Sequence, residues 1–294
     1  MKLIGALSGF TAAAIWGGMY VVSGYILNET GAMKSFTLLT LRLVIGILVL
    51  IPIAAARSEL RFTREQIKSL LFVGFVGYGV SLSLQFLGTQ FSGGANGALI
   101  TSASPAFIVL FAFLILRESL NVPRVLAILL ATVGVVIVVF DPAQVNLGRD
   151  RVWGNLALLG AAVTWGLYSV LVKWSGAKGL STLAITVMVL VGGLPVAIPF
   201  SIWEIATAPI KVDAVIIGGI LYLGIISTAL AMFLWNKSFE LLDASVASLM
   251  FFAQPVVGVA LSAWLLRDPL GANFFIGGAM ILLGVLLASL HKRV

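Results

Sequence analysis

The chain has 294 residues, of which 61% are hydrophobic and only 10% are charged, and its mean hydropathy is +1.14. A soluble domain carries about 25% charged residues, so the composition excludes a soluble globular protein and indicates a helical membrane protein. The formal net charge of +7 does not indicate nucleic-acid binding, because the basic residues lie in short clusters at the ends of apolar runs. The absence of cysteine excludes a disulfide framework and thiol chemistry.

The apolar runs are long enough to cross a bilayer, which takes about 20 residues per helix. In chain order, the predicted membrane-spanning helices cover residues 3–27, 36–56, 68–90, 93–116, 122–140, 153–174, 181–202, 213–236, 243–266 and 270–290. The first run follows Lys2 as a signal peptide would, but it continues to about Leu27 without a convincing cleavage site and is read as a retained span. The sequence therefore predicts an all-α polytopic membrane protein with ten transmembrane helices.

The second half of the chain repeats the first. The stretch from Ala95 to Val135 recurs 150 positions later, so that Pro105 aligns with Pro255, and each proline precedes an apolar-Arg-acidic turn. A Trp-Gly pair that begins at Trp16 in the first span recurs 149 positions later in the sixth span. We therefore predict a first five-helix repeat over residues 1–140, a linker over residues 141–152 and a second repeat over residues 153–294.

Five spans in each repeat is an odd number, so the second repeat must enter the membrane in the opposite orientation. Such inverted repeats are typical of many secondary transporters. With the N-terminus inside the cell, twelve Lys and Arg residues lie on the inner side and five on the outer side, with the largest group in the loop from Arg57 to Lys68. Because inner loops carry an excess of positive charge, we expect both termini in the cytoplasm and the chain in the cell inner membrane.

The inventory of reactive side chains argues against an enzyme. The only histidine, His291, lies in the C-terminal tail, and the sequence has no HExxH motif and no pair of aspartates within a span. No Asp or Glu lies in the middle of a predicted span, which disfavours a carboxylate-based proton relay and a cationic cargo. We expect no metal site and no cofactor.

Ionisable residues are rare within the predicted spans. Arg42 lies about two turns into the second span, where a charge is costly unless it reaches water, headgroups or a polar partner. Two interpretations stay open: the side chain extends to the headgroups or contacts backbone carbonyls, or it faces the transport path and holds a substrate carboxylate. Glu118 and Asp268, in the helix turns next to Arg117 and Arg267, are predicted to form local ion pairs or helix caps.

Aromatic and uncharged polar side chains at mid-span depth form the predicted binding site. Trp16 and Tyr20 share one helix face, and Trp165 and Tyr168 occupy the corresponding depth in the sixth span. Uncharged polar groups in hydrocarbon need partners and are expected to point inward, while helix packing is the alternative for each residue. The predicted substrate-binding residues are Trp16, Tyr20, Arg42, Tyr78, Ser81, Gln85, Asn96, Trp165, Tyr168, Tyr222 and Gln254.

The two aligned prolines lie in the middle of predicted helices. Pro105 leaves the carbonyl of Thr101 without its helical partner, and Pro255 does the same for the carbonyl of Phe251. Each proline is therefore either a hinge beside a cavity or a static kink that improves packing, and both interpretations stay open.

These features together resemble a known family. Ten spans in two inverted halves, the Trp-Gly pairs, Arg42 in the second span and the helices of Pro105 and Pro255 are similar to the drug/metabolite transporter superfamily, EamA type. The resemblance covers essentially the whole chain and implies export of small metabolites, amino acids among them.

We therefore expect an inner-membrane secondary transporter that exports a small neutral or zwitterionic metabolite by alternating access. The lipid bilayer and a small-molecule substrate are its expected partners, and one chain is enough to build the cavity. The alternatives are a proton-coupled exporter of drugs or cationic metabolites and a membrane subunit without transport.

Overall fold

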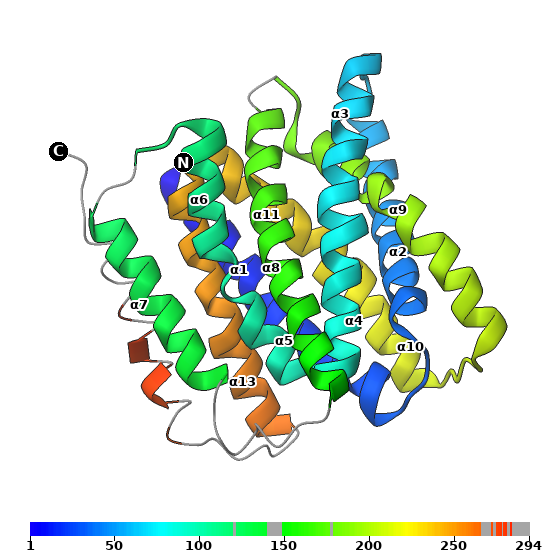
Figure 1. Ribbon diagram of the computed structural model, residues 1–294. Coiled ribbons are helices and arrows are strands. Elements are labelled where there is room, and N and C mark those ends of the chain that lie inside the picture. Colours follow the sequence, from blue (N-terminus) through cyan, green and yellow to red (C-terminus); the bar gives the residue numbers. More distant parts are fainter. Residues whose placement is uncertain are drawn as a thin grey trace.

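The computed structural model describes residues 1–119, 122–139, 149–176 and 179–265, together with residues 272, 275–277, 279, 280 and 283. Every regular element in this part of the chain is a helix. The helices form one bundle, with α7 (Val122–Val139) on one flank and α9 (Thr182–Thr207) on the opposite flank (Figure 1). Most of the predicted linker and most of the predicted span 270–290 lie outside the described residues.

The remaining elements follow in chain order. The first half forms α1 (Lys2–Gly24), η1 (Tyr25–Glu29), α2 (Ser35–Ala56), α3 (Arg64–Gly74), η2 (Phe75–Ser81), α4 (Leu82–Ser92), α5 (Gly94–Thr101) and α6 (Ser104–Leu116). The second half forms α8 (Arg149–Gly176), α10 (Ala214–Leu221), η4 (Tyr222–Leu230), α11 (Ala231–Leu241), α12 (Ala244–Ala247), η5 (Ser248–Phe252) and α13 (Ala253–Leu265). The segments η1, η2 and η4 are wider π-helical turns, and η5 is a tighter 3₁₀ turn.

Local sequence signals fix several helix starts. The helix α3 begins after Thr63, whose hydroxyl accepts a hydrogen bond from the Gln66 amide at 3.3 Å while the Gln66 side chain accepts one from the Thr63 amide at 2.9 Å. This reciprocal pair is a capping box. The helices α9 and α10 begin after Ser181 and Asp213, whose side chains each accept a hydrogen bond from the amide three residues further on.

The lengths of the helices indicate a multi-pass membrane protein. Six helical runs are long and apolar enough to cross a bilayer: Lys2–Glu29, Ser35–Ala56, Arg64–Ser92, Val152–Gly176, Thr182–Thr207 and Ala214–Leu241. Two shorter apolar helices cover Ser104–Leu116 and Ala244–Gly258. The predicted all-helical membrane fold is therefore confirmed, whereas the described residues do not confirm the count of ten spans.

One predicted span is not a continuous helix, and this part of the prediction was wrong. Span 93–116 breaks at Ser102 and Ala103 into α5 and α6, whereas the helix of span 243–266 continues from α12 through the tighter turn η5 into α13. Pro105 is the second residue of α6 and Pro255 the third residue of α13, so each proline lies near the start of a second helix. The physical reason is that proline lacks an amide donor and clashes with the preceding turn.

The carbonyl group freed at this break finds a new partner. The carbonyl oxygen of Thr101 lacks a helical amide donor, because the residue four positions further on is Pro105. The Ser104 hydroxyl donates to this oxygen instead, at 2.6 Å. The break is therefore compatible with a buried position, where an unpaired carbonyl is costly.

The two halves contact each other in matching pairs. The helix α1 packs against α11 and α13, and α8 packs in the same way against α4 and α6, while α2 packs against α9. Gly24 at the end of α1 approaches Gly94. Gly154 near the start of α8 approaches Ser92, which lies only two residues before Gly94. The end of α1 and the start of α8 thus lie at the same end of the bundle, and the two helices run in opposite directions.

The other end of the bundle joins the loop before α3 to the start of α9. The Ser181 hydroxyl donates a hydrogen bond to the Glu59 carboxylate at 2.5 Å. Two connections that occupy different positions in the two repeats therefore lie at one end of the bundle, as oppositely oriented repeats require.

Two carboxylates cap helices that belong to the other half of the chain. Glu204, near the end of α9 and 4% exposed, accepts hydrogen bonds from the Phe36 and Thr37 amides at 3.2 and 2.7 Å at the start of α2. Glu118 accepts hydrogen bonds from the Ala244 and Ser245 amides at 2.8 and 3.2 Å at the start of α12. Carboxylates at helix N-termini satisfy free amides and oppose the helix dipole. Glu118 is thus a helix cap, although it caps a distant helix and not its own turn.

Replacing Glu204 with alanine is expected to lower the free energy of unfolding by about 1–3 kcal/mol, because two buried amides of α2 would lose their acceptor. The apparent melting temperature of the purified protein in detergent micelles would report this change. Glu65→Ala is the control: Glu65 forms an exposed ion pair with Lys68 at 3.5 Å, and its removal should leave the melting temperature unchanged. Equal melting temperatures for the two variants would contradict the capping role.

Candidate functional site

A cavity of about 330 Å³ lies in the middle of the bundle, where the two halves meet. The residues that line it are Trp16, Met19, Tyr20, Ser81, Leu82, Gln85, Thr101, Ser104, Ala161, Trp165, Met232, Phe251 and Gln254. The lining is apolar and aromatic with a few hydroxyl and amide groups, and none of these side chains is charged.

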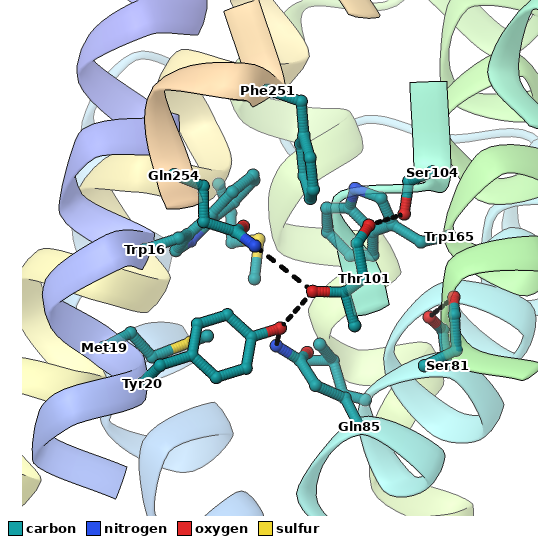
Figure 2. A pocket seen from close by; sticks show the side chains of 13 residues that line it. Trp16, Met19, Tyr20, Ser81, Gln85, Thr101, Ser104, Trp165, Phe251 and Gln254 are labelled. Atoms are coloured by element: carbon teal, nitrogen blue, oxygen red, sulfur yellow. Dashed lines mark hydrogen bonds between the residues drawn. The ribbon is translucent and has the colours of Figure 1, made fainter. Parts of the chain in front are cut away.

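A hydrogen-bond network crosses this cavity (Figure 2). The Gln85 amide nitrogen donates to the Tyr20 hydroxyl at 2.5 Å, and the Tyr20 and Thr101 hydroxyls are 2.7 Å apart. Because Thr101 donates its own proton to the Gly97 carbonyl at 2.6 Å, Tyr20 must be the donor to Thr101. Gln254 also donates to Thr101, at 3.1 Å. The network therefore ties α1, α4, α5 and α13 together around the cavity.

The network leaves acceptors for a ligand. The side-chain nitrogens of Gln85 and Gln254 are the donors in it. Their side-chain oxygens accept no hydrogen bond within the described part of the chain. Two amide oxygens in an apolar wall can bind the N–H groups of a small molecule.

Four aromatic rings form a cluster on one side of the cavity. Trp16 and Trp165, which correspond in the two repeats, are in edge contact with ring centroids 5.3 Å apart, and Trp235 and Phe251 lie within 6.0 Å of Trp16. The Trp16 indole donates to the Ser227 carbonyl at 3.0 Å, whereas the buried Trp165 indole N–H has no hydrogen-bond partner among the described residues. Trp165 thus supplies an unused donor in the cavity wall.

The glycines that follow these tryptophans explain the repeated Trp-Gly pair. A Cβ atom on Gly17 would lie 2.7 Å from the backbone of Gln254 and Gly258. On Gly166 it would lie 2.6 Å from the Cβ of Phe107. The helix α1 therefore crosses α13, and α8 crosses α6, at points with no room for a side chain, and each crossing places the neighbouring indole in the cavity.

Arg42 is completely buried and does not reach the surface of the bundle, so it does not extend to the headgroups. Its Nε donates to Thr228 Oγ1 at 2.7 Å, and its Nη2 lies 3.4 Å from the Ser227 carbonyl oxygen in the π-helical segment η4. Its Nη1 contacts the sulfur of Met19 at 3.1 Å, and Cζ lies 5.2 Å from the centre of the Phe86 ring. Arg42 does not line the cavity itself, but Met19 does.

The other predicted residues divide into two groups. Ser81 lines the cavity and donates to the Ala161 carbonyl at 2.9 Å. Asn96 is buried outside the cavity lining, and Tyr222, which also lies outside it, donates to the Ile15 carbonyl at 2.8 Å. The predicted residues that line the cavity are Trp16, Tyr20, Ser81, Gln85, Trp165 and Gln254, and those that do not are Arg42, Tyr78, Asn96, Tyr168 and Tyr222.

Tyr78 and Tyr168 belong to a second polar chain behind the aromatic cluster. Tyr168 donates to the Asn236 side-chain oxygen at 2.9 Å and lies 2.9 Å from the Tyr78 hydroxyl, and Asn236 donates to Thr186 at 2.9 Å. The Tyr168 ring also packs on Trp165, with centroids 4.7 Å apart. This chain therefore connects the wall of the central cavity to Asn236.

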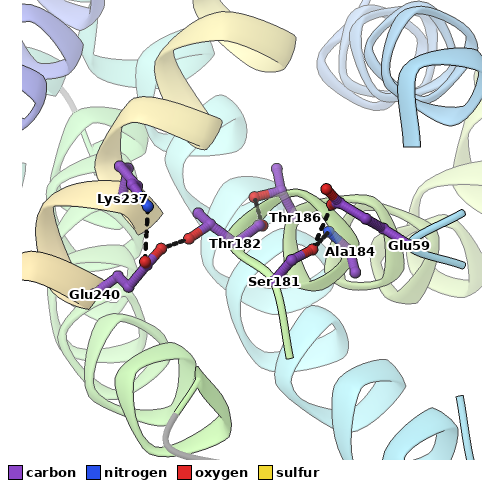
Figure 3. A network of polar contacts seen from close by, with 7 residues as sticks. All are labelled: Glu59, Ser181, Thr182, Ala184, Thr186, Lys237 and Glu240. Atoms are coloured by element: carbon purple, nitrogen blue, oxygen red, sulfur yellow. Dashed lines mark hydrogen bonds and ion pairs between the residues drawn. The ribbon is translucent and has the colours of Figure 1, made fainter. Parts of the chain in front are cut away.

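Asn236 also lines a second cavity, of about 590 Å³, between α8, α9 and α11. Around its rim, Glu240 accepts hydrogen bonds from Lys237 at 2.7 Å and from Thr182, close to the contact between Ser181 and Glu59 (Figure 3). Lys173, another lining residue, donates to the Phe239 carbonyl at 3.1 Å. The sequence did not predict this cavity.

Several residues of the central cavity were also missed in the sequence. Met19, Thr101, Met232 and Phe251 all line it. The available signal was the spacing to the prolines, since Thr101 and Phe251 each lie four positions before one. The methionines carry no such signal. Within the described residues, no three His, Cys, Asp or Glu side chains gather as a metal ion would require.

Gly17→Ala is expected to lower the free energy of unfolding by about 1–3 kcal/mol, because the new methyl group would force α1 away from α13. Gly218→Ala is the matched control: a Cβ at Gly218 in α10 would meet no atom within 4 Å, so the same change should be neutral or slightly stabilising. Apparent melting temperatures in detergent micelles compare the two variants. A Gly17→Ala protein as stable as Gly218→Ala would show that the crossing is not tight.

Comparison with known proteins identifies the family. The sequence profile of the EamA-like transporter family matches residues 3–140 and 152–290. The uncharacterized transporter YetK of Bacillus subtilis (strain 168) is 26% identical over 99% of this chain and 89% of its own length. The uncharacterized inner membrane transporter YicL of Salmonella typhimurium is 28% identical over 98% of this chain and 96% of its own length.

A solved structure has the same fold, with a TM-score of 0.78 over 97% of this chain and 96% of its own, at 24% identity. The family profile matches both halves of the chain, and the relatives of near-equal length are named uncharacterized transporters. The chain belongs to the EamA-like transporter family and is a multi-pass membrane transporter.

Proposed function

We propose that this transporter exports a small neutral or zwitterionic metabolite, an amino acid or a similar molecule, through the central cavity. The observation that carries the proposal is the cavity of about 330 Å³ between the two halves, walled by indole rings, hydroxyls and amides. Aromatic faces suit an apolar side chain, and the free oxygens of Gln85 and Gln254 suit an N–H donor.

Movement of the two halves relative to each other would give alternating access to this cavity. The helix irregularities support this part of the proposal, because Thr101 and Gln254 line the cavity next to the break before Pro105 and the 3₁₀ turn before Pro255. A change of angle at either point would therefore move a wall of the cavity. One chain supplies the whole lining, so a monomer is sufficient.

The proposal includes ten spans in two inverted repeats, over residues 1–140 and 153–294, with both termini in the cytoplasm of a cell whose inner membrane holds the chain. The opposite directions of α1 and α8 support the inversion. The basic residues near the loop that holds Glu59 support a cytoplasmic position for that end.

The alternative of a proton-coupled exporter of cations has less support. A cationic cargo calls for a carboxylate in the binding site, and none of the residues that line the central cavity is Asp or Glu. The buried Glu204 is already bonded to the amides of α2 at the edge of the bundle. We therefore favour a cargo without net positive charge.

The topology has a direct test, because the chain contains no cysteine. Single substitutions Lys34→Cys, Arg61→Cys and Lys211→Cys place a thiol at exposed loop positions. A membrane-impermeant maleimide added to intact cells is expected to label positions 34 and 211, and to label position 61 only after permeabilisation. Because Arg61 and Lys211 lie in corresponding loops of the two repeats, labelling of both from the same side would contradict the inversion.

The transport function is tested with the purified full chain in liposomes, using a panel of labelled amino acids and a quaternary ammonium dye. Trp16→Ala or Trp165→Ala should reduce the initial rate by about two- to tenfold, since an aromatic contact contributes about 0.5–1.5 kcal/mol. Trp264→Ala is the control, because Trp264 is 77% exposed on the outside of α13 and should transport normally.

Three outcomes would contradict the proposal. Normal transport by both cavity variants would show that the cavity is not the binding site. Transport of the dye alone would favour the cationic alternative. Transport of no compound in the panel would favour a membrane subunit without transport.

A further inference from the structure

Arg42 is a buried cation with no carboxylate partner among the described residues. Its side chain is 0% exposed, and its polar neighbours are Thr228, Ser227 and Met19. Buried charges in proteins are normally paired, because the removal of a charge from water is costly. The buried carboxylate on the neighbouring helix, Glu204, is used by the start of α2. The site thus has a positive charge that the described protein does not neutralise.

The hydrogen-bonding capacity of this guanidinium is only partly used. A guanidinium carries five N–H donors. Nε donates to Thr228 at 2.7 Å, and Nη2 lies 3.3 and 3.4 Å from the hydroxyl and carbonyl oxygens of Ser227. Nη1 has a single contact, with the Met19 sulfur at 3.1 Å, and a thioether is a weak acceptor. The Nη1 edge is therefore open to a stronger acceptor.

Met19 lies between this edge and the central cavity. Its side chain lines the cavity beside Tyr20 (Figure 2), and its sulfur contacts Arg42. An unbranched methionine side chain has three rotatable bonds and adapts to new neighbours at low cost. A rotation of Met19 would expose Nη1 to a molecule in the cavity.

The two repeats differ in charge at this position. Gly46 on α2 approaches Thr228, and Gly193 on α9 approaches Tyr78 in the same way. Gly46 and Gly193 therefore occupy corresponding positions in the two repeats. Four residues before each glycine stand Arg42 and Val189. The second repeat therefore has an uncharged valine at the position that corresponds to Arg42.

We propose that the central cavity takes a substrate with a carboxylate group, and that this carboxylate displaces the Met19 sulfur and accepts hydrogen bonds from Nη1 of Arg42. Charge-assisted hydrogen bonds of this kind are about twice as strong as neutral ones. The unused Trp165 N–H and the free oxygens of Gln85 and Gln254 face the rest of the molecule. This inference rests on the proposed function and narrows its cargo to carboxylates.

Four compounds of similar shape separate the contributions of a carboxylate and of an ammonium group to binding. Leucine and 4-methylpentanoate carry the carboxylate with and without an ammonium group, and leucinamide and 4-methylpentanamide are the corresponding amides. Binding to the purified full chain in micelles is measured by tryptophan fluorescence, and transport is measured in liposomes. Each acid is expected to bind at least about tenfold more tightly than its amide, which corresponds to about 1.4 kcal/mol. Equal binding of acids and amides would overturn the inference.

Two substitutions locate the preference. Arg42→Gln is expected to abolish the roughly tenfold preference for acids while the amides bind as before. Met19→Ala is expected to increase the preference, because no side chain has to be displaced. Met232→Ala is the matched control, since Met232 also lines the cavity but has no contact with Arg42. An equal loss of acid and amide binding in Arg42→Gln would show a purely structural role.

If Arg42→Gln does not fold, the acid preferences of Met19→Ala and Met232→Ala are compared to test the inference. An acid preference that is the same in Met19→Ala and Met232→Ala would overturn the inference. The two readouts also separate it from the proposed function. Tight, Arg42-dependent binding of acids without transport would refute the transport proposal alone, and transport without preference for acids would refute the inference alone.

Discussion

Polar groups buried in this bundle have no water to bind, because the outside of the bundle is as apolar as its inside. A buried polar group is therefore stabilised when it finds a partner within the protein. The chain supplies such partners across its two halves: Glu204 caps α2, Glu118 caps α12, and Ser227 accepts from Trp16 and Arg42. Each of these groups finds its partner in the other half of the chain. The association of the halves, and with it the central cavity, depends on these shared hydrogen bonds.

The cavity arises where this association is interrupted. Glycine crossings at Gly17 and Gly166 bring two pairs of helices into backbone contact and turn Trp16 and Trp165 inward. Pro105 and Pro255 lie next to these tight contacts, with a helix break before the first and a 3₁₀ turn before the second. Close packing and local interruption of helices thus lie side by side, an arrangement that suits a binding site at the middle of a membrane.

The sequence predicted those features that composition and periodicity carry. The apolar runs, the repeat and the inward position of Trp16, Tyr20 and Gln85 follow from length, register and the cost of polar groups in hydrocarbon. Continuous hydropathy hid the interruption at Ser102, because a broken apolar helix has the same composition as a straight one. Glu204 lies two residues beyond the predicted end of its span and gave no signal. Partners that lie far away in sequence, such as Ser227 for Arg42, cannot be read from any local pattern.

The difference between Arg42 and Val189 has a consequence for any molecule in the cavity. Two identical repeats would present the same surroundings to both ends of a substrate in the cavity. The substrate could then bind in either of two orientations. If a substrate carboxylate binds Arg42 as proposed, the two ends of the cavity differ, because the corresponding position in the second half is a valine. A substrate whose two ends differ would then bind in a single orientation, although the two halves of the protein are nearly symmetric.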